Sequence, residues 1–149
     1  MRLFIDGDAF PNLLKAIVLR AIEKQKIDTL VVANKKINIG KSTYIKYLIV
    51  DLGADEADNK IVELVLENDL VITADIPLAD RVISKNAHAI DHRGQAYTID
   101  NIKQYLAYRN LMQDIRDQGE MTKGPAAFGT KDASNFANSF NAFLQKLNK

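Results

Sequence analysis

Residues 3–11 read Leu3-Phe4-Ile5-Asp6-Gly7-Asp8-Ala9-Phe10-Pro11. The apolar run predicts a buried strand that delivers Asp6 and Asp8 to the edge of a sheet, and Pro11 suits the first turn of a helix. A second stretch has the same order of features, Leu70-Val71-Ile72-Thr73-Ala74-Asp75-Ile76-Pro77-Leu78-Ala79-Asp80. We expect these two strand ends to meet and to hold a metal ion.

Strands and helices are predicted in alternation along the first two thirds of the chain. Apolar residues at helical spacing predict the helices, and β-branched runs bounded by polar residues predict the strands. Further strands are expected at residues 27–33, 44–50, 70–73 and 87–90, and helices from residues 11, 54 and 77. Strict alternation with short links requires parallel strands joined by helical crossovers. We therefore predict an α/β fold, a three-layer α/β/α arrangement around a central, mostly parallel sheet.

The whole chain, residues 1–149, is expected to form one domain, because this length suits a single core. Residues 1–92 would be the α/β core. Residues 93–149 would be a C-terminal extension of helices packed on that core. The segment 91–98 is predicted to be a loop or a hairpin.

The composition limits the chemistry. The formal net charge is +1, so an anionic partner must be bound by local clusters of lysine and arginine. The chain has no cysteine, which leaves oxygen or histidine ligands for a metal. No apolar run approaches the roughly 18 residues of a membrane span, so we expect a cytoplasmic protein with no membrane partner. The sequence leaves a monomer or a homodimer open.

Acidic residues follow the predicted strand in each of the two stretches quoted above. In open α/β sheets, sites form beyond the carboxyl ends of the strands where the strand order reverses. If the first and fourth strands are neighbours, Asp6, Asp8 and Asp75 converge there, with Asp58 and Asp80 approaching from helix starts. Carboxylates packed together need a cation, and Mg²⁺ or Mn²⁺ prefers such oxygen ligands. A cation held in this way can activate water for phosphodiester cleavage.

Each of these acids has a simpler interpretation. An aspartate after a strand is most often a helix cap or a turn former, and Asp8, Asp55 and Asp75 could each serve in that way. Asp58 is harder to explain as a solvated charge, because it shares a helix face with Ile61 and Val65. The joint arrangement therefore indicates more than any single acid does.

Several motifs taken together resemble those of the YaiI/YqxD family of bacterial proteins, which is similar to PIN-like and NYN nuclease domains. They are Asp6-Gly7-Asp8-Ala9-Phe10-Pro11, Gly53-Ala54-Asp55-Glu56-Ala57-Asp58, Ile72 to Ala79, Arg93-Gly94 with Tyr97-Thr98, and Gly124-Pro125 with Phe128. The family's opening usually reads Asp-Ala-Asp-Ala-Cys-Pro, so this chain departs from it at Gly7 and Phe10. Any role ascribed to that cysteine in relatives cannot be essential here, whereas both acids remain.

The resemblance implies a PIN-like fold and a metal-dependent nuclease, with RNA favoured over DNA as the substrate. It gives the metal roles to Asp6, Asp58, Asp75 and, farther out, Asp80. We accordingly predict Asp6, Asp58 and Asp75 as catalytic residues, with Asp8 completing the set of Mg²⁺ or Mn²⁺ ligands. Asp55, Asp80 and Arg109 would support these ligands from outside, Arg109 by facing a carboxylate from the apolar stripe of its helix.

Four basic residues are candidates for RNA binding. Lys35, Lys36 and Lys41 occupy one loop after a strand and could contact phosphates, although a solvated lysine loop is the commoner arrangement. Arg93, beside Gly94, is the fourth.

Two other functions stay open on the sequence alone. A non-catalytic PIN-like binding or regulatory module could retain the acids for structure or for a structural ion. An acid cluster also serves phosphatase chemistry on small substrates.

Overall fold

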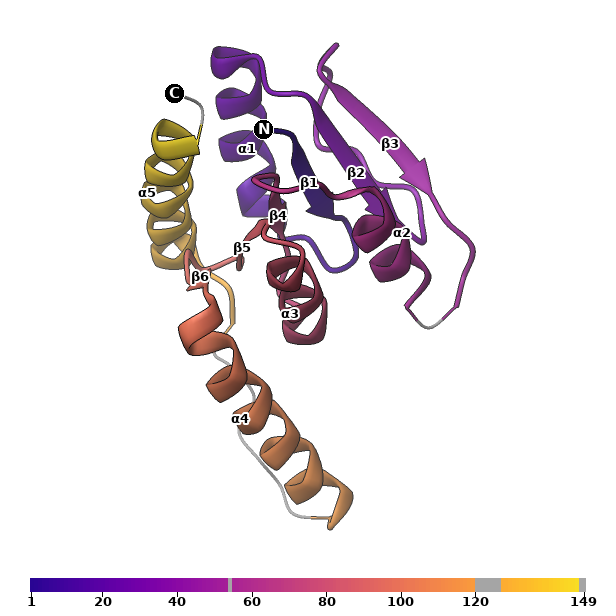
Figure 1. The fold of residues 1–149 in the computed structure, drawn as a ribbon. Helices are drawn as coiled ribbons and strands as arrows, with labels where there is room; N and C mark the ends of the chain where they lie inside the picture. Colours follow the sequence, from indigo (N-terminus) through magenta and orange to yellow (C-terminus); the bar gives the residue numbers. More distant parts are fainter. Residues whose placement is uncertain (54, 120–126, 148–149) are drawn as a thin grey trace.

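The computed structural model describes residues 1–53, 55–119 and 127–147. Its strands are β1 (Leu3–Asp6), β2 (Thr29–Ala33), β3 (Ile45–Ile49), β4 (Leu70–Ile72), β5 (His88–Ile90) and β6 (Ala96–Tyr97). Its helices are α1 (Asn12–Gln25), α2 (Glu56–Leu64), α3 (Ile76–Ser84), α4 (Ile99–Asp117) and α5 (Thr130–Leu147). The predicted alternation of strands and helices is confirmed (Figure 1).

The strands form one sheet of six in the order β3-β2-β1-β4-β5-β6. All neighbouring pairs are parallel except β5 and β6, which are antiparallel. Strand β1 lies between β2 and β4, with Ile5 opposite Val31 on one side and Ile72 on the other. The predicted adjacency of the first and fourth strands is therefore confirmed. The segment 91–98 forms a hairpin whose second strand, β6, belongs to the sheet, so the part after residue 92 is not wholly helical.

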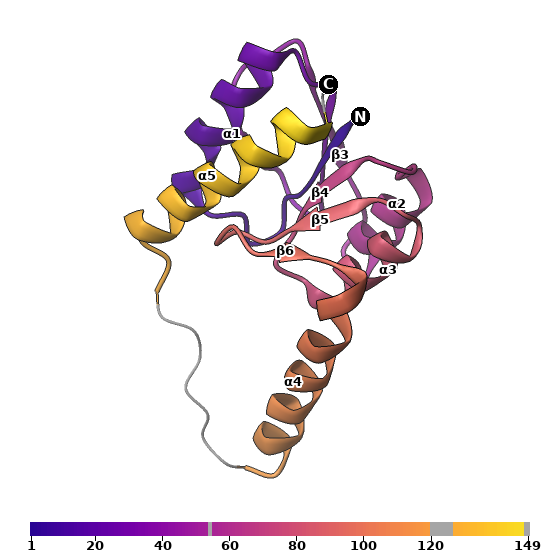
Figure 2. The ribbon, with the colours of Figure 1, turned by 60° about the vertical axis from the view of Figure 1, so that its left-hand side comes forward.

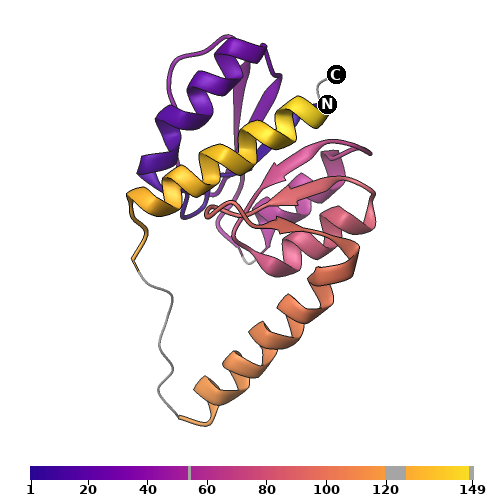
Figure 3. The ribbon, with the colours of Figure 1, turned by 90° about the vertical axis from the view of Figure 1, so that its left-hand side faces the viewer.

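Helices cover both faces of the sheet, because successive side chains of each strand point to opposite faces. Leu3 and Ile5 pack with α1 and α5 on one face, whereas Phe4 packs with α2 and α3 on the other. The result is the three-layer α/β/α arrangement predicted from the sequence. Figures 2 and 3 show α5 lying along α1 although the two helices come from opposite ends of the chain.

Helix α4 differs from the others in its packing. Its first turns contact α3, and Ile102 is its one buried side chain. The rest of the helix extends away from the sheet and its covering helices (Figures 2 and 3). A capping box fixes its start, since the Thr98 hydroxyl accepts from the Asn101 backbone N–H and the Asn101 side chain accepts from the Thr98 backbone N–H. None of the helices in the described ranges is long and apolar enough to cross a membrane.

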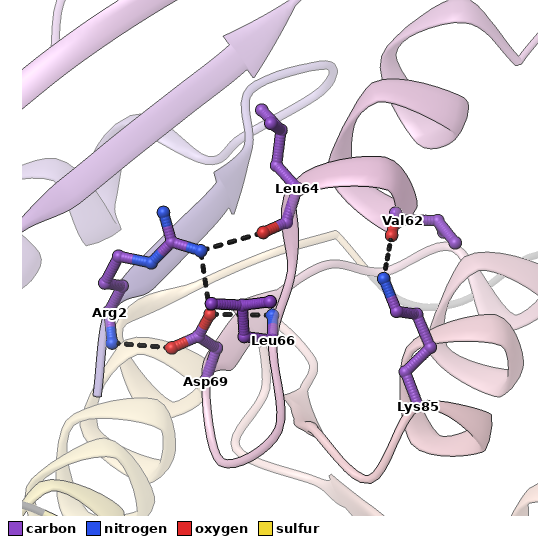
Figure 4. A network of polar contacts seen from close by, with 6 residues as sticks. All are labelled: Arg2, Val62, Leu64, Leu66, Asp69 and Lys85. Atoms are coloured by element: carbon purple, nitrogen blue, oxygen red, sulfur yellow. Dashed lines mark hydrogen bonds and ion pairs between the residues drawn. The ribbon is translucent and has the colours of Figure 1, made fainter.

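The amino edge of the sheet is held by a network around Asp69 (Figure 4). Asp69 is buried and its carboxylate accepts from the backbone N–H groups of Arg2 and Leu66, both at 2.9 Å. The Arg2 guanidinium lies 3.3 Å from the same carboxylate and donates to the Leu64 carbonyl at 2.8 Å. One side chain thus joins the start of β1 to the loop between α2 and β4.

Replacing Asp69 with alanine should therefore destabilise the protein by about 2–4 kcal/mol, because two backbone donors and a guanidinium lose a buried acceptor. Urea unfolding followed by circular dichroism measures this loss. Glu67→Ala is the matched control, since Glu67 is exposed in the same loop. Equal midpoints for the two variants would contradict the role given to Asp69.

Candidate metal centre

Adjacent parallel strands bring two aspartates to the same edge of the sheet. Asp6 is the last residue of β1, and Asp75 follows β4 as the N-cap of α3. Thr73, fully buried between them, donates from its hydroxyl to Asp6 Oδ2 at 2.8 Å and accepts from the Asp75 backbone N–H at 3.0 Å. The threonine hydroxyl thus fixes the first acid relative to the second.

Asp6 is the most buried of the acids. It is 7% exposed, and its Oδ1 accepts from the Asp8 backbone N–H at 3.2 Å. The pKa of Asp6 is raised to about 6, chiefly by burial and to a smaller extent by the charges of Asp8 and Asp75, whereas the hydrogen bonds from Thr73 and Asp8 oppose the rise. A proton therefore leaves Asp6 close to neutral pH.

Asp58 lies in the first turn of α2 and is half-buried, as its place on the apolar face predicted. Its pKa is raised to about 7 by several causes together, of which burial is the largest, followed by the charges of Asp75 and Asp6 and by a hydrogen bond with the Asp75 carboxyl group. The raised pKa lets Asp58 keep its proton closer to neutral pH, which is one way to relieve the repulsion between packed acids. A divalent cation would be another.

Asp75 and Asp8 also have structural roles. Asp75 Oδ1 accepts from the Leu78 backbone N–H at 3.1 Å and caps α3, so the simpler interpretation of this acid is correct as well. Asp8 does not cap α1, whose N-cap is Pro11. Instead, its Oδ1 accepts from the Asn34 backbone N–H at 3.0 Å and ties the end of β2 to the loop after β1.

These acids line one open cavity of about 330 Å³. Its walls come from the ends of β1, β2 and β4 and from the start of α2. The acidic side chains on its lining are Asp6, Asp8, Asp55, Glu56, Asp58 and Asp75. Asp55, predicted as a supporting residue, is exposed at the rim with a left-handed backbone, φ 66°, and makes no side-chain cap.

The donor set suits a hard divalent cation. The acids offer oxygen ligands to the cavity, and burial together with neighbouring charges raises the pKa of Asp6 and Asp58, so a bound cation would favour their ionised forms. Within the described ranges, no group of three or more His, Cys, Asp or Glu side chains is already arranged to hold a metal ion. Asp6, Asp8, Asp58 and Asp75 would supply the protein ligands of Mg²⁺ or Mn²⁺, and water would supply the rest.

Asp80 lies apart from this cavity. It forms an ion pair with Lys103 of α4, with Asp80 Oδ1 and Lys103 Nζ 3.2 Å apart, and it is absent from the cavity lining. Its position in the second turn of α3 directs it to the neighbouring helix, so the expected approach to the acid cluster is wrong.

The two arginines also lie elsewhere. Arg109 is exposed on the projecting part of α4 and forms no ion pair with a residue of the described ranges, so the predicted buried pairing is wrong. Arg93 forms an ion pair with Asp132 at 2.8 Å and lies over the Phe128 ring, which joins the β5–β6 turn to α5. Arg93 is thus engaged in holding α5.

The lysines divide into two groups. Lys35 and Lys36 are exposed and directly follow Asn34, which lines the cavity. Lys41 is exposed near the end of the same loop, four residues before β3 begins at the opposite edge of the sheet. Only the first two are therefore next in the chain to a residue of the cavity lining.

Thr73 was missed as a site residue. Its signal in the sequence is a polar residue that closes an apolar run two positions before an aspartate. Replacing Thr73 with valine, which preserves shape but removes the hydroxyl, should destabilise the protein by about 1–3 kcal/mol and raise the pKa of Asp6 further. Thermal melting and a pH titration of Asp6 by carbon-detected NMR measure both effects, with Thr73→Ser as the variant that keeps the hydroxyl. An unchanged Asp6 titration in the valine variant would contradict this role.

The fold and the cavity define an α/β protein with an acidic centre at the carboxyl edge of a mostly parallel sheet. Comparison with known proteins gives its family. A family model described as "Uncharacterized BCR, YaiI/YqxD family" matches residues 4–146, and the chain belongs to this family. Of the resemblance noted in the sequence, residues Ala54, Gly124 and Pro125 lie outside the described ranges.

Relatives of high identity span nearly the full chain. The chain is 71% identical to a UPF0178 protein of Sulfurovum sp. over 146 residues, which covers 98% of this chain and 99% of the relative. It is 68% identical to a UPF0178 protein of Sulfurimonas denitrificans, covering 98% and 97%. A UPF0178 protein of Nitratiruptor sp. is 62% identical, covering 100% and 98%. No solved structure matches the chain.

Proposed function

We propose that this protein is a metal-dependent phosphodiesterase that cleaves nucleic acid, with RNA as the expected substrate. The observation that carries the proposal is the meeting of Asp6, Asp58 and Asp75 in one cavity, where burial and the neighbouring carboxylates raise the pKa of Asp6 and of Asp58. Acids that repel one another at neutral pH are suited to a divalent cation. The resemblance to PIN-like nucleases supports the same chemistry.

The protein's own residues would prepare this site in two ways. Thr73 holds the Asp6 carboxylate in place, and the α3 N-terminus holds Asp75 through the Leu78 backbone N–H. Asp58 and Asp6 lose their protons near neutral pH, when a cation can take the place of those protons. When bound, Mg²⁺ or Mn²⁺ would supply Lewis-acid activation of water and of a phosphodiester.

Lys35 and Lys36 extend the proposal to a polyanion. They are exposed and directly follow Asn34 of the cavity lining in a protein with almost no net charge, so they would attract a phosphate backbone locally. Lys41 and Arg93, by their positions, would contribute less.

Incubation of the purified protein with a fluorescent single-stranded RNA and Mn²⁺ tests the proposal. We expect cleavage that depends on Mn²⁺ or Mg²⁺ and stops with EDTA, with single-stranded DNA and p-nitrophenyl phosphate as comparison substrates. Turnover of the phosphomonoester alone would favour a phosphatase. No hydrolysis of any of these, together with no calorimetric uptake of Mn²⁺, would favour a non-catalytic module.

A further inference from the structure

A second cavity, of about 550 Å³, opens beside the hairpin that follows β5. It lies between the β5–β6 turn, the first turns of α4 and the side of α5. Polar groups and one aromatic ring line it, among them Asp91, Gln95, Tyr105, Asn135, Asn138 and Ser139. We call this cavity the amide groove, after the side chains of Gln95, Asn135 and Asn138.

The amide groove opens at the same edge of the sheet as the acid cavity. Strand β5 is the parallel neighbour of β4, so its carboxyl end lies about 5 Å from the strand end that leads to Asp75. A chain molecule crossing this edge would meet both cavities.

The wall of the groove is fixed in place. Asp91 Oδ1 accepts from the backbone N–H groups of Arg93 and Gln95 at 2.9 and 2.8 Å. Gly94 has φ +92°, and a Cβ there would lie 2.7 Å from the Asn135 carbonyl oxygen, so only glycine allows the turn to approach α5 this closely. The ion pair between Arg93 and Asp132 holds the same contact. The groove is therefore a preformed feature.

The chemistry of the lining suits a nucleobase better than a phosphate. Carboxamides offer both donors and acceptors, as the edges of bases require, and single-stranded RNA exposes those edges. The Tyr105 ring, packed edge-on against Tyr97 at 5.3 Å, provides an aromatic surface at the groove. The one cationic side chain of the turn, Arg93, is already engaged with Asp132.

We propose that the amide groove binds a base of single-stranded RNA next to the acid cavity. This inference deepens the proposed function and rests on it for the nature of the substrate. The side chains of Asn138 and Tyr105 would contact the base. The groove would thereby give the protein a preference for unpaired RNA.

Binding of a fluorescein-labelled single-stranded hexaribonucleotide, measured by fluorescence anisotropy with Mg²⁺, tests this inference. All proteins carry Asp75→Asn so that the RNA stays intact. Adding Asn138→Ala or Tyr105→Ala should weaken binding about tenfold, the effect of losing one base contact. Asn141→Ala and Tyr108→Ala are the matched controls, since both residues are exposed on the same helices and lie outside the groove. Equal melting temperatures establish that the variants fold.

Groove variants that bind like their controls, or a parent protein that does not bind the oligonucleotide, would overturn the inference. An oligonucleotide with one abasic position sharpens the test, because Asn138→Ala should no longer matter when the base it contacts is missing. Hydrolysis of bis(p-nitrophenyl) phosphate by the wild-type protein with Mn²⁺ reports on the proposed function alone. Selective loss of RNA binding without such hydrolysis would support the groove and count against the phosphodiesterase.

Discussion

Replacing Asp75 with asparagine is expected to reduce Mn²⁺-dependent RNA cleavage by more than roughly 100-fold. Loss of a residue that only hydrogen-bonds a metal ligand typically costs roughly 10- to 100-fold, and Asp75 is expected to bind the metal itself. The substitution removes a charge from the centre of the acid cavity. Asparagine is as good an N-cap as aspartate, so the hydrogen bond to Leu78 and the start of α3 should be kept. Initial cleavage rates and thermal melting, measured on the same preparation, separate the two effects.

Asp80→Asn is the matched control for that experiment. Asp80 belongs to α3, which Asp75 caps, carries the same charge as Asp75 and pairs with Lys103 outside the cavity. Its cleavage rate should stay at the wild-type level. Equal losses in the Asp75 and Asp80 variants would show that charge on α3, rather than a ligand in the cavity, governs the activity.

The stability of the metal-free protein is expected to fall as the pH rises from about 4 to about 7. The pKa values of Asp6 and Asp58 are about 6 and 7 in the folded protein and 3.8 in a free side chain. Between these values the folded state holds more protons than the unfolded state, so raising the pH favours unfolding. Above about pH 7 this contribution levels off. The fall reflects the cost of ionising buried carboxyl groups and, in smaller part, the repulsion between them, both of which a bound cation would relieve.

Asp58→Asn isolates this effect. The variant removes one of the repelling charges and can still donate a hydrogen bond to Asp75. At pH 8 it should be more stable than the wild type by about 1 kcal/mol, a figure reduced for the partial exposure of Asp58, or about 2–4 °C in Tm. At pH 5 the difference should be smaller. Differential scanning calorimetry at the two pH values measures it.

Manganese provides the complementary half of this prediction. Added at 100 times its Kd, Mn²⁺ should stabilise the wild-type protein by about 2.7 kcal/mol at pH 8. It should stabilise less at pH 5, where protons compete for the carboxylates. In Asp58→Asn the gain should be smaller at both pH values. The proposed repulsion between these acids would be contradicted if Asp58→Asn were less stable than the wild type at pH 8 and if Mn²⁺ stabilised the two proteins equally.

The sequence predicted the core of the fold because its signals are local. The buried run before Asp6 and the run before Asp75 each determine a strand, and the usual strand order makes them neighbours. The place of Asp58 also followed from local spacing, since it lies three residues before Ile61, which is buried on the inner face of α2. Residues at strand ends and in first helical turns were thus located well.

The errors come from geometry that local spacing does not contain. Asp80 follows Asp75 by five residues, and at 3.6 residues per turn it points about 140° away around the helix. The stripe that includes Arg109 continues along α4 after the helix has left the body, so its spacing no longer implies burial. The pairing of Arg93 with Asp132 joins segments far apart in the chain. Such contacts depend on how the elements pack, and a single sequence does not show that.

The central claim is that the acids at the ends of β1 and β4 hold a divalent cation. A crystal structure of the protein soaked in Mn²⁺, with data collected at the manganese absorption edge, tests it directly. We predict an anomalous difference peak in the acid cavity, in contact with Asp6 and Asp75. Ordered density for both side chains with no anomalous peak between them, at millimolar Mn²⁺ and pH 8, would contradict the claim.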